Sequence, residues 1–422
     1  MVCPMRFLSA AVMVSLLSAA VPSGSAAAQA ATTYYVDSKA GDDAAAGTSA
    51  TAPWKSLDPV NAADLKPGDT VSFKRGSSFA GPLTLAAKGT AAKPIVVRAH
   101  GTGKPPRITG RTTACVVITG AYWHVSGLRA TGCEWAGFEI TGDRNVLAGI
   151  EADHNVTGVS ITRTGARNTV RDSKITDNNR MSVNDEGGDN DSGAFGILIN
   201  GDDNFIADNT ITGSHAKSHD YGVDGAAIEI FSGNRNRILR NISRDNNTFT
   251  ELGAKKGHTA TGNLFAFNVV TSSLKSGSFL VTRGAGHVVG PVKGTVVLHN
   301  SVSMPARKTI GWACHDGCSP SILKVRNNAI SVGGEAGYED GKGADEAGNV
   351  YRARTAKFRL GSRSVMADPR FVSRSDLRLR AGSPARERAV RLSPAWFGGE
   401  AFAKDVNGKP LPSAPHAGAY QG

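Results

Sequence analysis

The sequence has 422 residues, and 48 Lys and Arg against 36 Asp and Glu give it a formal net charge of +12. With 40% hydrophobic and 20% charged residues, the composition is that of a globular protein and excludes a disordered acidic tail or a small scaffold. Fifty Gly and only 6% aromatic residues favour many short strands and tight turns over long helices. The composition therefore indicates a repetitive β architecture.

The first thirty residues have the pattern of a secretory signal peptide. Arg6 is followed by an apolar stretch over residues 7–21 and by small residues, among which Ala28-Gln29-Ala30 has the small-x-small pattern of a cleavage site. The apolar stretch is shorter than the ~20 residues that span a bilayer, so a membrane anchor is the less favoured alternative. We predict a signal peptide over 1–30 and a secreted, extracellular mature chain over 31–422.

Cysteine usage agrees with export. Of the five cysteines, Cys3 falls within the predicted signal peptide, and the remaining even number permits three pairings. Sequence proximity favours Cys115 with Cys133 and Cys314 with Cys318, as disulfides in an oxidising compartment. A metal site at Cys314 and Cys318 is the alternative, although no second Cys/His pair lies nearby.

The positive net charge predicts attraction to polyanions. The basic residues are dispersed along the chain, and no aromatic and basic stripe of the kind that binds single-stranded nucleic acid is present. Outside a cell, the abundant polyanions are acidic polysaccharides. We therefore expect an acidic polysaccharide as the partner of a monomer, without nucleic acid or membrane.

From about Cys115 onward, the sequence repeats with a period of about twenty residues, which indicates a solenoid. Each repeat consists of a short strand, a Gly/Asp/Asn turn and two further short strands. Alternate apolar positions of successive repeats would stack into a continuous core, namely Phe138, Ile140, Val159, Ile161, Ile197, Ile199, Ile228 and Ile230. One turn position is always Asn, which tolerates left-handed backbone, so we expect a structural role for Asn145, Asn168, Asn204 and Asn236.

These repeats are accompanied by opening segments at 34–43 and 65–76 and by closing segments at 368–372, 376–385 and 418–420. In these features, the chain resembles the pectate-lyase-like superfamily of secreted right-handed parallel β-helix proteins. The resemblance implies an all-β, single-stranded solenoid. Its parts would be an N-terminal cap and first coils over 31–110, regular coils with an active-site groove over 111–330, and C-terminal coils with a closing segment over 331–422.

Two insertions interrupt the repeats, at 178–192 and 214–225, and both precede the same strand of a repeat. Insertions in a solenoid gather on one face, so these segments should wall a groove. The floor of the groove would be made of outward strand positions. By alternation, these positions are Glu139, Ser160, Leu198 and Glu229, and the following segments add Glu251, Lys255, Lys256, His258 and Arg283.

This collection of side chains favours a polysaccharide lyase. β-Elimination from a uronate polymer needs a base, an acid for the leaving oxygen, and a cation or donor that neutralises the substrate carboxylate. Tyr221 is a candidate for both base and acid if a nearby cation lowers its proton affinity. The resemblance to β-helix alginate lyases implies the same chemistry, so we expect β-elimination of a uronate-containing polysaccharide, with alginate as the first candidate.

The candidate catalytic residues are therefore Tyr221, Lys255, His219, Glu229 and Arg283. The candidate substrate-binding residues are Lys217, Asp224, Glu251, Lys256, His258 and Glu139. Loop histidines are also possible bases, namely His215, His219, His258 and His287.

Three other functions stay open. Glu229 with Asp224 or Glu251 would suit a glycoside hydrolase, which acts through paired carboxylates. A mannuronan epimerase shares the fold and most of the elimination chemistry, and a non-catalytic surface protein would use the groove to hold glycan. We assign no metal or other cofactor, although calcium is a weaker alternative, since four oxygen ligands are clustered in one segment at Asp185, Glu186, Asp189 and Asp191.

Overall fold

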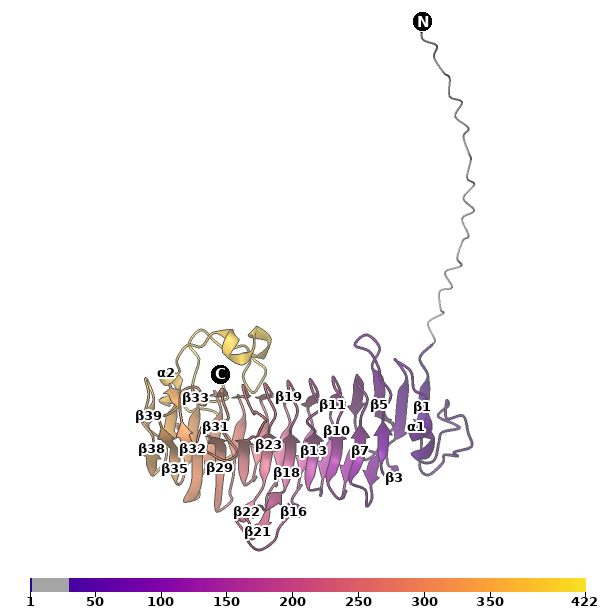
Figure 1. The fold of residues 1–422 in the computed structure, drawn as a ribbon, viewed down its shortest axis with the longest axis horizontal. Coiled ribbons are helices and arrows are strands. Elements are labelled where there is room, and N and C mark those ends of the chain that lie inside the picture. Colours follow the sequence, from indigo (N-terminus) through magenta and orange to yellow (C-terminus); the bar gives the residue numbers. More distant parts are fainter. Residues whose placement is uncertain (2–29) are drawn as a thin grey trace. The chain divides into compact units, whose positions relative to one another are not determined.

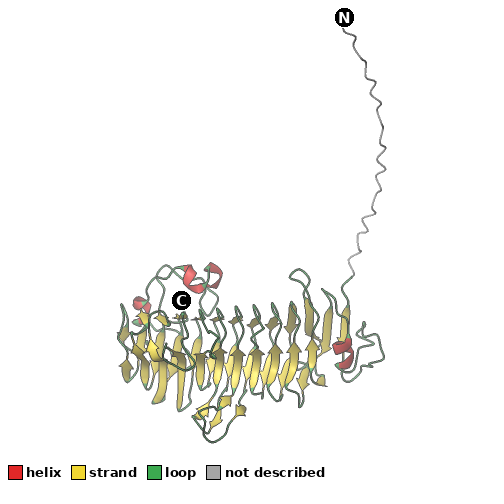
Figure 2. Cartoon of the chain, in the orientation of Figure 1, coloured by secondary structure: helices red, strands yellow, loops and turns green. Residues whose placement is uncertain are grey.

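The chain winds through three long parallel sheets, and each turn of the chain adds one strand to every sheet. The computed structural model describes Met1 and residues 30–422, so the predicted signal peptide lies, except for its two end residues, outside the described residues. The strands between Thr33 and Met366 form a right-handed parallel β-helix, the expected fold class, and a few short helical segments accompany it (Figures 1 and 2). These segments are α1 (Asp58–Ala62), α2 (Ala385–Arg388), η1 (Pro394–Phe397) and η2 (Glu400–Phe402).

Sheet 1 contains β1 (Thr33–Val36), β2 (Thr70–Lys74), β5 (Ile95–His100), β8 (Trp123–Ser126), β11 (Val146–Ala148), β14 (Thr169–Arg171), β19 (Phe205–Ala207), β24 (Arg237–Leu239), β27 (Leu264–Ala266), β30 (Thr295–Leu298), β33 (Leu323–Arg326) and β36 (Asp345–Ala347). Sheet 2 contains β4 (Leu83–Leu85), β7 (Ala114–Ile118), β10 (Ala136–Ile140), β13 (Thr157–Ile161), β18 (Phe195–Ile199), β23 (Ala226–Phe231), β26 (Thr248–Gly253), β29 (Ser276–Arg283), β32 (Lys308–Cys318), β35 (Glu335–Gly341) and β38 (Thr355–Lys357). Sheet 3 contains β3 (Ser78–Ala80), β6 (Arg107–Thr109), β9 (Arg129–Thr131), β12 (Glu151–Asp153), β15 (Lys174–Thr176), β20 (Thr210–Thr212), β25 (Ile242–Arg244), β28 (Val269–Thr271), β31 (Ser301–Met304), β34 (Ala329–Val332), β37 (Val350–Arg352) and β39 (Val365–Met366).

The core is the stack of apolar side chains inside the coil. On sheet 2, Phe138 pairs in register with Val159, and the same column continues through Ile197 and Ile228. All four side chains are fully buried. Because one coil has too few apolar atoms to form a core alone, this burial depends on stacking, as the repeat predicts.

The recurring asparagines form a ladder of side-chain to backbone hydrogen bonds. The backbone N–H of Asn145 donates to Oδ1 of Asn168 at 2.9 Å, and the pattern repeats from Asn168 to Asn204 and from Asn204 to Asn236. The structural role is confirmed, but the left-handed residue is the one before each Asn. The preceding residues with positive φ are Arg144, Arg167, Asp203 and Arg235. The amide side chain thus satisfies the backbone at a sharp turn that its neighbour makes.

Both predicted insertions are antiparallel hairpins on the sheet 2 side. The first hairpin consists of β16 (Met181–Val183) and β17 (Ser192–Gly193), and the second of β21 (Ala216–Ser218) and β22 (Gly222–Asp224). They lead directly into β18 and β23, and they project together from one side of the solenoid in Figure 1.

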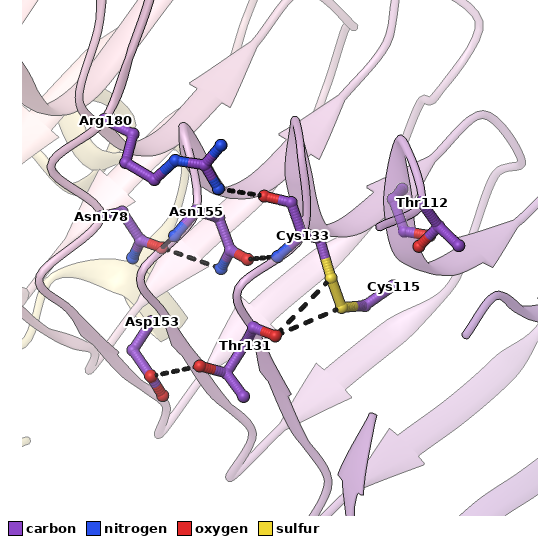
Figure 3. Close-up of a disulfide and its surroundings, with 9 residues drawn as sticks. Thr112, Cys115, Thr131, Cys133, Asp153, Asn155, Asn178 and Arg180 are labelled. Atoms are coloured by element: carbon purple, nitrogen blue, oxygen red, sulfur yellow. Dashed lines mark hydrogen bonds between the residues drawn. A yellow bond between two sulfur atoms is a disulfide. The ribbon is translucent and has the colours of Figure 1, made fainter. Parts of the chain in front are cut away.

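The two predicted disulfides are confirmed. Cys115 and Cys133 are bonded with their Cα atoms 5.7 Å apart, and Figure 3 shows this bond beside the polar contacts of three successive coils. Cys314 is bonded to Cys318 with a Cα separation of 5.6 Å, so these sulfurs are not free to hold a metal. No helix of the described residues has the length and apolarity needed to cross a membrane.

Candidate functional site

The strand register of sheet 2 shows how the outward positions, expected to form the floor of a groove, follow one another from coil to coil. Glu139 pairs with Ser160, Ser160 with Leu198, and Leu198 with Glu229. The same column continues to Glu251 on β26, which pairs with Glu229. This order confirms the floor positions predicted by alternation and establishes the register of Glu251.

Three carboxylic acids meet where the second hairpin joins the floor. Glu229 and Glu251 are partners on adjacent strands, which lie about 4.8 Å apart in a sheet. Burial, together with the neighbouring Glu251 and Asp224, raises the pKa of Glu229 well above its usual value. Burial and the charges of Glu251 and Asp191 raise the pKa of Asp224 to about 6. The site therefore holds protons on carboxylic acids at a higher pH than ordinary surface acids do.

Arg283 is the cation of this cluster. It forms an ion pair with Glu251 from the next strand of sheet 2, and its side chain is 14% exposed. Its Nε and Nη1 atoms are buried and have no hydrogen-bond partner among the described residues. The positive charge of Arg283 lowers the pKa of Glu229, whereas the neighbouring carboxylates raise it. The charge of this guanidinium is thus buried beside the carboxylates, with Glu251 as its ion-pair partner.

Two histidines lie on the other side of Arg283. His315 pairs with Arg283 in the register of β29 and β32, and its ring lies 5.1 Å from the ring of Tyr338. Burial and the charge of Arg283 lower the pKa of both His287 and His315, so the two rings are neutral at neutral pH. His287 was a candidate base, whereas His315 and Tyr338 were missed because the repeat is not regular enough after residue 283 to align their strands.

The two hairpins are held together by carboxylates. Asp191 accepts hydrogen bonds from Ser218 Oγ at 2.7 Å and from the backbone N–H of Asp220 at 3.0 Å. Asp220 in turn accepts the backbone N–H groups of Asn190 and Asp191. Part of the acidic segment therefore ties the first hairpin to the second. Within the described residues, no group of three or more His, Cys, Asp and Glu side chains is placed to hold a metal ion.

Tyr221 lies at the tip of the second hairpin and is 49% exposed. Partial burial and the carboxylate of Asp189, with smaller effects of Asp220 and Asp224, raise the pKa of Tyr221 to about 12. A tyrosine base needs a cation beside it, and the charges that act on this phenol are negative. His219 and Lys217 on the same hairpin are exposed to solvent.

The remaining candidates lie away from the carboxylate cluster. Lys255, Lys256 and His258 are exposed in the turn that follows β26, and Arg163 Nη1 donates to His258 Nε2 at 3.0 Å. Glu139 is on the floor, but β13 and β18 separate its strand from that of Glu229. Burial raises the pKa of Glu139. The predicted residues that the structure brings together are thus Asp224, Glu229, Glu251 and Arg283.

An apolar patch continues the floor beside the carboxylates. Phe195, Leu198 and Ala226 form a small cluster on sheet 2, against which the partly exposed Trp135 packs. Leu198 is the strand partner of Glu229, so the patch borders the carboxylate cluster directly. The sequence placed Leu198 on the floor, but Trp135 precedes its strand and was missed.

Comparison with known proteins identifies the fold and gives one short match in sequence. No family model matches the chain. A stretch of 82 residues is 52% identical to a lacto-N-biosidase of Bifidobacterium longum and covers 18% of this chain and 5% of that protein. The chain therefore spans a small fraction of that curated relative.

Two solved structures share the architecture. Pectate lyase Pel9A has a TM-score of 0.62 at 16% identity, over 93% of this chain and 97% of the lyase. The GH136 lacto-N-biosidase of Eubacterium ramulus has a TM-score of 0.59 at 17% identity, over 80% of this chain and 67% of the biosidase. At these identities, the likeness establishes a common fold.

Proposed function

We propose that this protein is a secreted glycoside hydrolase and that the cluster of Asp224, Glu229 and Glu251 is its catalytic centre. The observation that carries the proposal is the raised pKa of Glu229 beside a second carboxylate that is ion-paired with Arg283. A glycosidase needs one protonated and one ionised carboxyl group on the two sides of the bond that it cleaves. The 82-residue match to a lacto-N-biosidase supports this class of enzyme.

In this mechanism, Glu229 donates its proton to the glycosidic oxygen as the bond to the leaving sugar breaks. Glu251, held by Arg283, attacks the anomeric carbon, and water activated by the ionised Glu229 then releases the sugar. Neighbouring strands lie about 4.8 Å apart, close to the separation of ~5–5.5 Å between the carboxyl groups of retaining enzymes. We therefore expect retention of the anomeric configuration.

The charge of the site favours a neutral glycan. Asp191 adds a fourth negative charge beside Asp224, Asp189 and Asp220 lie beside Tyr221 on the second hairpin, and the cation of the cluster, Arg283, is ion-paired with Glu251. A polyuronate would meet like charge there. The partly exposed ring of Trp135, which packs against the buried Phe195, Leu198 and Ala226, instead suits the C–H face of an uncharged sugar.

Uronate lysis, the first prediction from the sequence, is the second candidate, with alginate as its first substrate. It is favoured by the positive charge of Arg283, which could stabilise the negative charge of a substrate carboxylate, and by the neutral rings of His287 and His315, which could take the proton. Tyr221, Lys255 and His219 are then candidates for contacts along the chain of the polymer.

The test is to incubate the mature chain, residues 31–422, with neutral oligosaccharides that end in lacto-N-biose and, separately, with alginate, pectate, glucuronan and hyaluronan. Hydrolysis gives new reducing ends without the absorbance of unsaturated uronates, and Glu229→Gln should lower its rate by a factor of about 10² to 10⁴. Glu151→Gln, on sheet 3, is the matched control and should keep the rate. Absorbance of unsaturated products on a polyuronate would replace the hydrolase with the lyase.

A further inference from the structure

A second candidate site lies on another face, between sheet 3 and the C-terminal segment. Ser303, Ser331 and Arg352 pair in register on β31, β34 and β37 and form one row. Residues 368–381 pack beside this row, and the two segments line an open cavity of about 790 Å³. This volume is in the range of ~300–1,000 Å³ that is usual for ligand sites.

The charged lining of the cavity is almost entirely arginine. The five cations are Arg352, Arg354, Arg370, Arg374 and Arg380, and the single acidic residue of the lining is Asp368. They come from two separate parts of the chain, sheet 3 and the closing segment, and an apolar cluster that includes Val350, Leu379 and Phe371 holds these parts together. Because all five arginines are exposed, their charges add to a positive potential on this face, which attracts anions.

The guanidinium groups have donors to offer. Arg370 donates to the carbonyl of Gly382 and Arg380 to that of Val372, while Arg352 is 3.7 Å from Asp368. Arg354 and Arg374 are exposed, and the side-chain hydrogen bonds and ion pairs found among the described residues include none from them. The planar fork of arginine matches carboxylate and sulfate groups with paired hydrogen bonds.

We propose that this cavity binds a segment of an acidic polysaccharide through its carboxylate or sulfate groups, separately from the catalytic groove. The floor row adds the Ser303 and Ser331 hydroxyls, which suit sugar hydroxyl groups. The attraction to polyanions that the net charge predicts then belongs to this face of the solenoid, whereas the groove takes a neutral glycan. The site would hold the enzyme on an anionic matrix while the groove works on another chain.

The experiment is titration calorimetry of the mature chain with an alginate hexasaccharide and with a heparin hexasaccharide, at low and physiological salt. Binding of either is expected, and the tighter of the two identifies carboxylate or sulfate as the recognised group. The variant Arg354→Ala/Arg374→Ala should weaken binding by about tenfold or more, since it removes charge-assisted hydrogen bonds. Arg354→Lys/Arg374→Lys keeps the charge and should recover part of the affinity.

The matched control is Arg98→Ala/Arg111→Ala, which removes the same charge from exposed positions near the N-terminal end. It should change the affinity by less than about twofold, because screened charges far from the cavity contribute little. Equal weakening by both double variants, absence of binding to both hexasaccharides, or tighter binding of a single-stranded oligonucleotide would each overturn the proposal. Thermal unfolding checks that all variants are folded, and hydrolysis in the groove should be unchanged in them.

Discussion

Replacement of Asp224 by Asn should stabilise the protein at neutral pH and not at acid pH. The pKa of Asp224 is about 6 in the folded protein against 3.8 for an ordinary aspartate. Between these two values, the folded chain binds more protons than the unfolded chain, so the free energy of unfolding falls as the pH rises. The ionised carboxylate is thus an unfavourable charge in the folded site above about pH 6.

The size of the effect follows from the difference between the two pKa values. A difference of about two corresponds to about 3 kcal/mol, because each pKa unit is worth about 1.4 kcal/mol. Asn keeps the side-chain oxygen that accepts the backbone N–H of Gly225 at 2.7 Å, so the local hydrogen bond is retained. We therefore expect Asp224→Asn to gain about 3 kcal/mol in the free energy of unfolding between pH 4 and pH 8 relative to the wild type.

Urea unfolding of the two proteins at several pH values between 4 and 8 measures this difference. Asp58→Asn, at an exposed position at the start of α1, is the control for the same exchange of side chains at the surface. A difference between Asp224→Asn and the wild type that stays constant from pH 4 to pH 8, or a loss of stability at pH 8, would refute the assignment of a strained carboxylate at position 224.

Three further predictions concern the site and the coil. Arg283→Gln should raise the pKa of Glu229, because the charge of Arg283 lowers it. The basic limb of the pH profile of kcat/KM should therefore move to higher pH. A basic limb that does not move would exclude Glu229 as the general acid. Trp135→Ala should raise KM for longer oligosaccharides with little change in kcat, whereas Trp135→Phe should retain most of the binding; a fall in kcat alone would contradict a binding role. Asn236→Ala should lower the free energy of unfolding, measured in urea, by about 3 kcal/mol or more, because it removes the hydrogen bonds to Asn204, Gly201 and Asn263 inside the coil. A loss below about 1 kcal/mol would show that the ladder does not stabilise the turn.

The solenoid could be predicted because its signals are local and repeated. Alternation placed Glu229 and Leu198 on the outer face, and both hairpins were visible as interruptions of the period. His315 could not be placed in this way, because the repeat loses its regularity before β32. In this part of the chain, the spacing of residues in the sequence does not show which coil a residue belongs to. The strand register in the folded structure does show it.

The charge of each surface is a property of the folded chain. The sequence shows a basic protein with 48 Lys and Arg, and from this total a cationic groove is the simplest expectation. Folding instead gathers carboxylates at the hairpins and five arginines at the C-terminal cavity. The net charge does not tell where on the folded surface the charged residues lie, so it cannot predict which surface binds which ligand.

The sequence alone was enough to predict the coil, its core columns, its Asn ladder and its disulfide pairs. It also predicted which face of sheet 2 carries the acidic side chains. Each of these features depends on spacing along the chain. The tertiary structure decided that Glu229, Asp224 and Glu251 form one cluster with Arg283, and it decided how strongly each acid holds its proton. Proton affinity depends on burial and on charges from neighbouring coils, and residues more than twenty positions apart become neighbours when the coils stack.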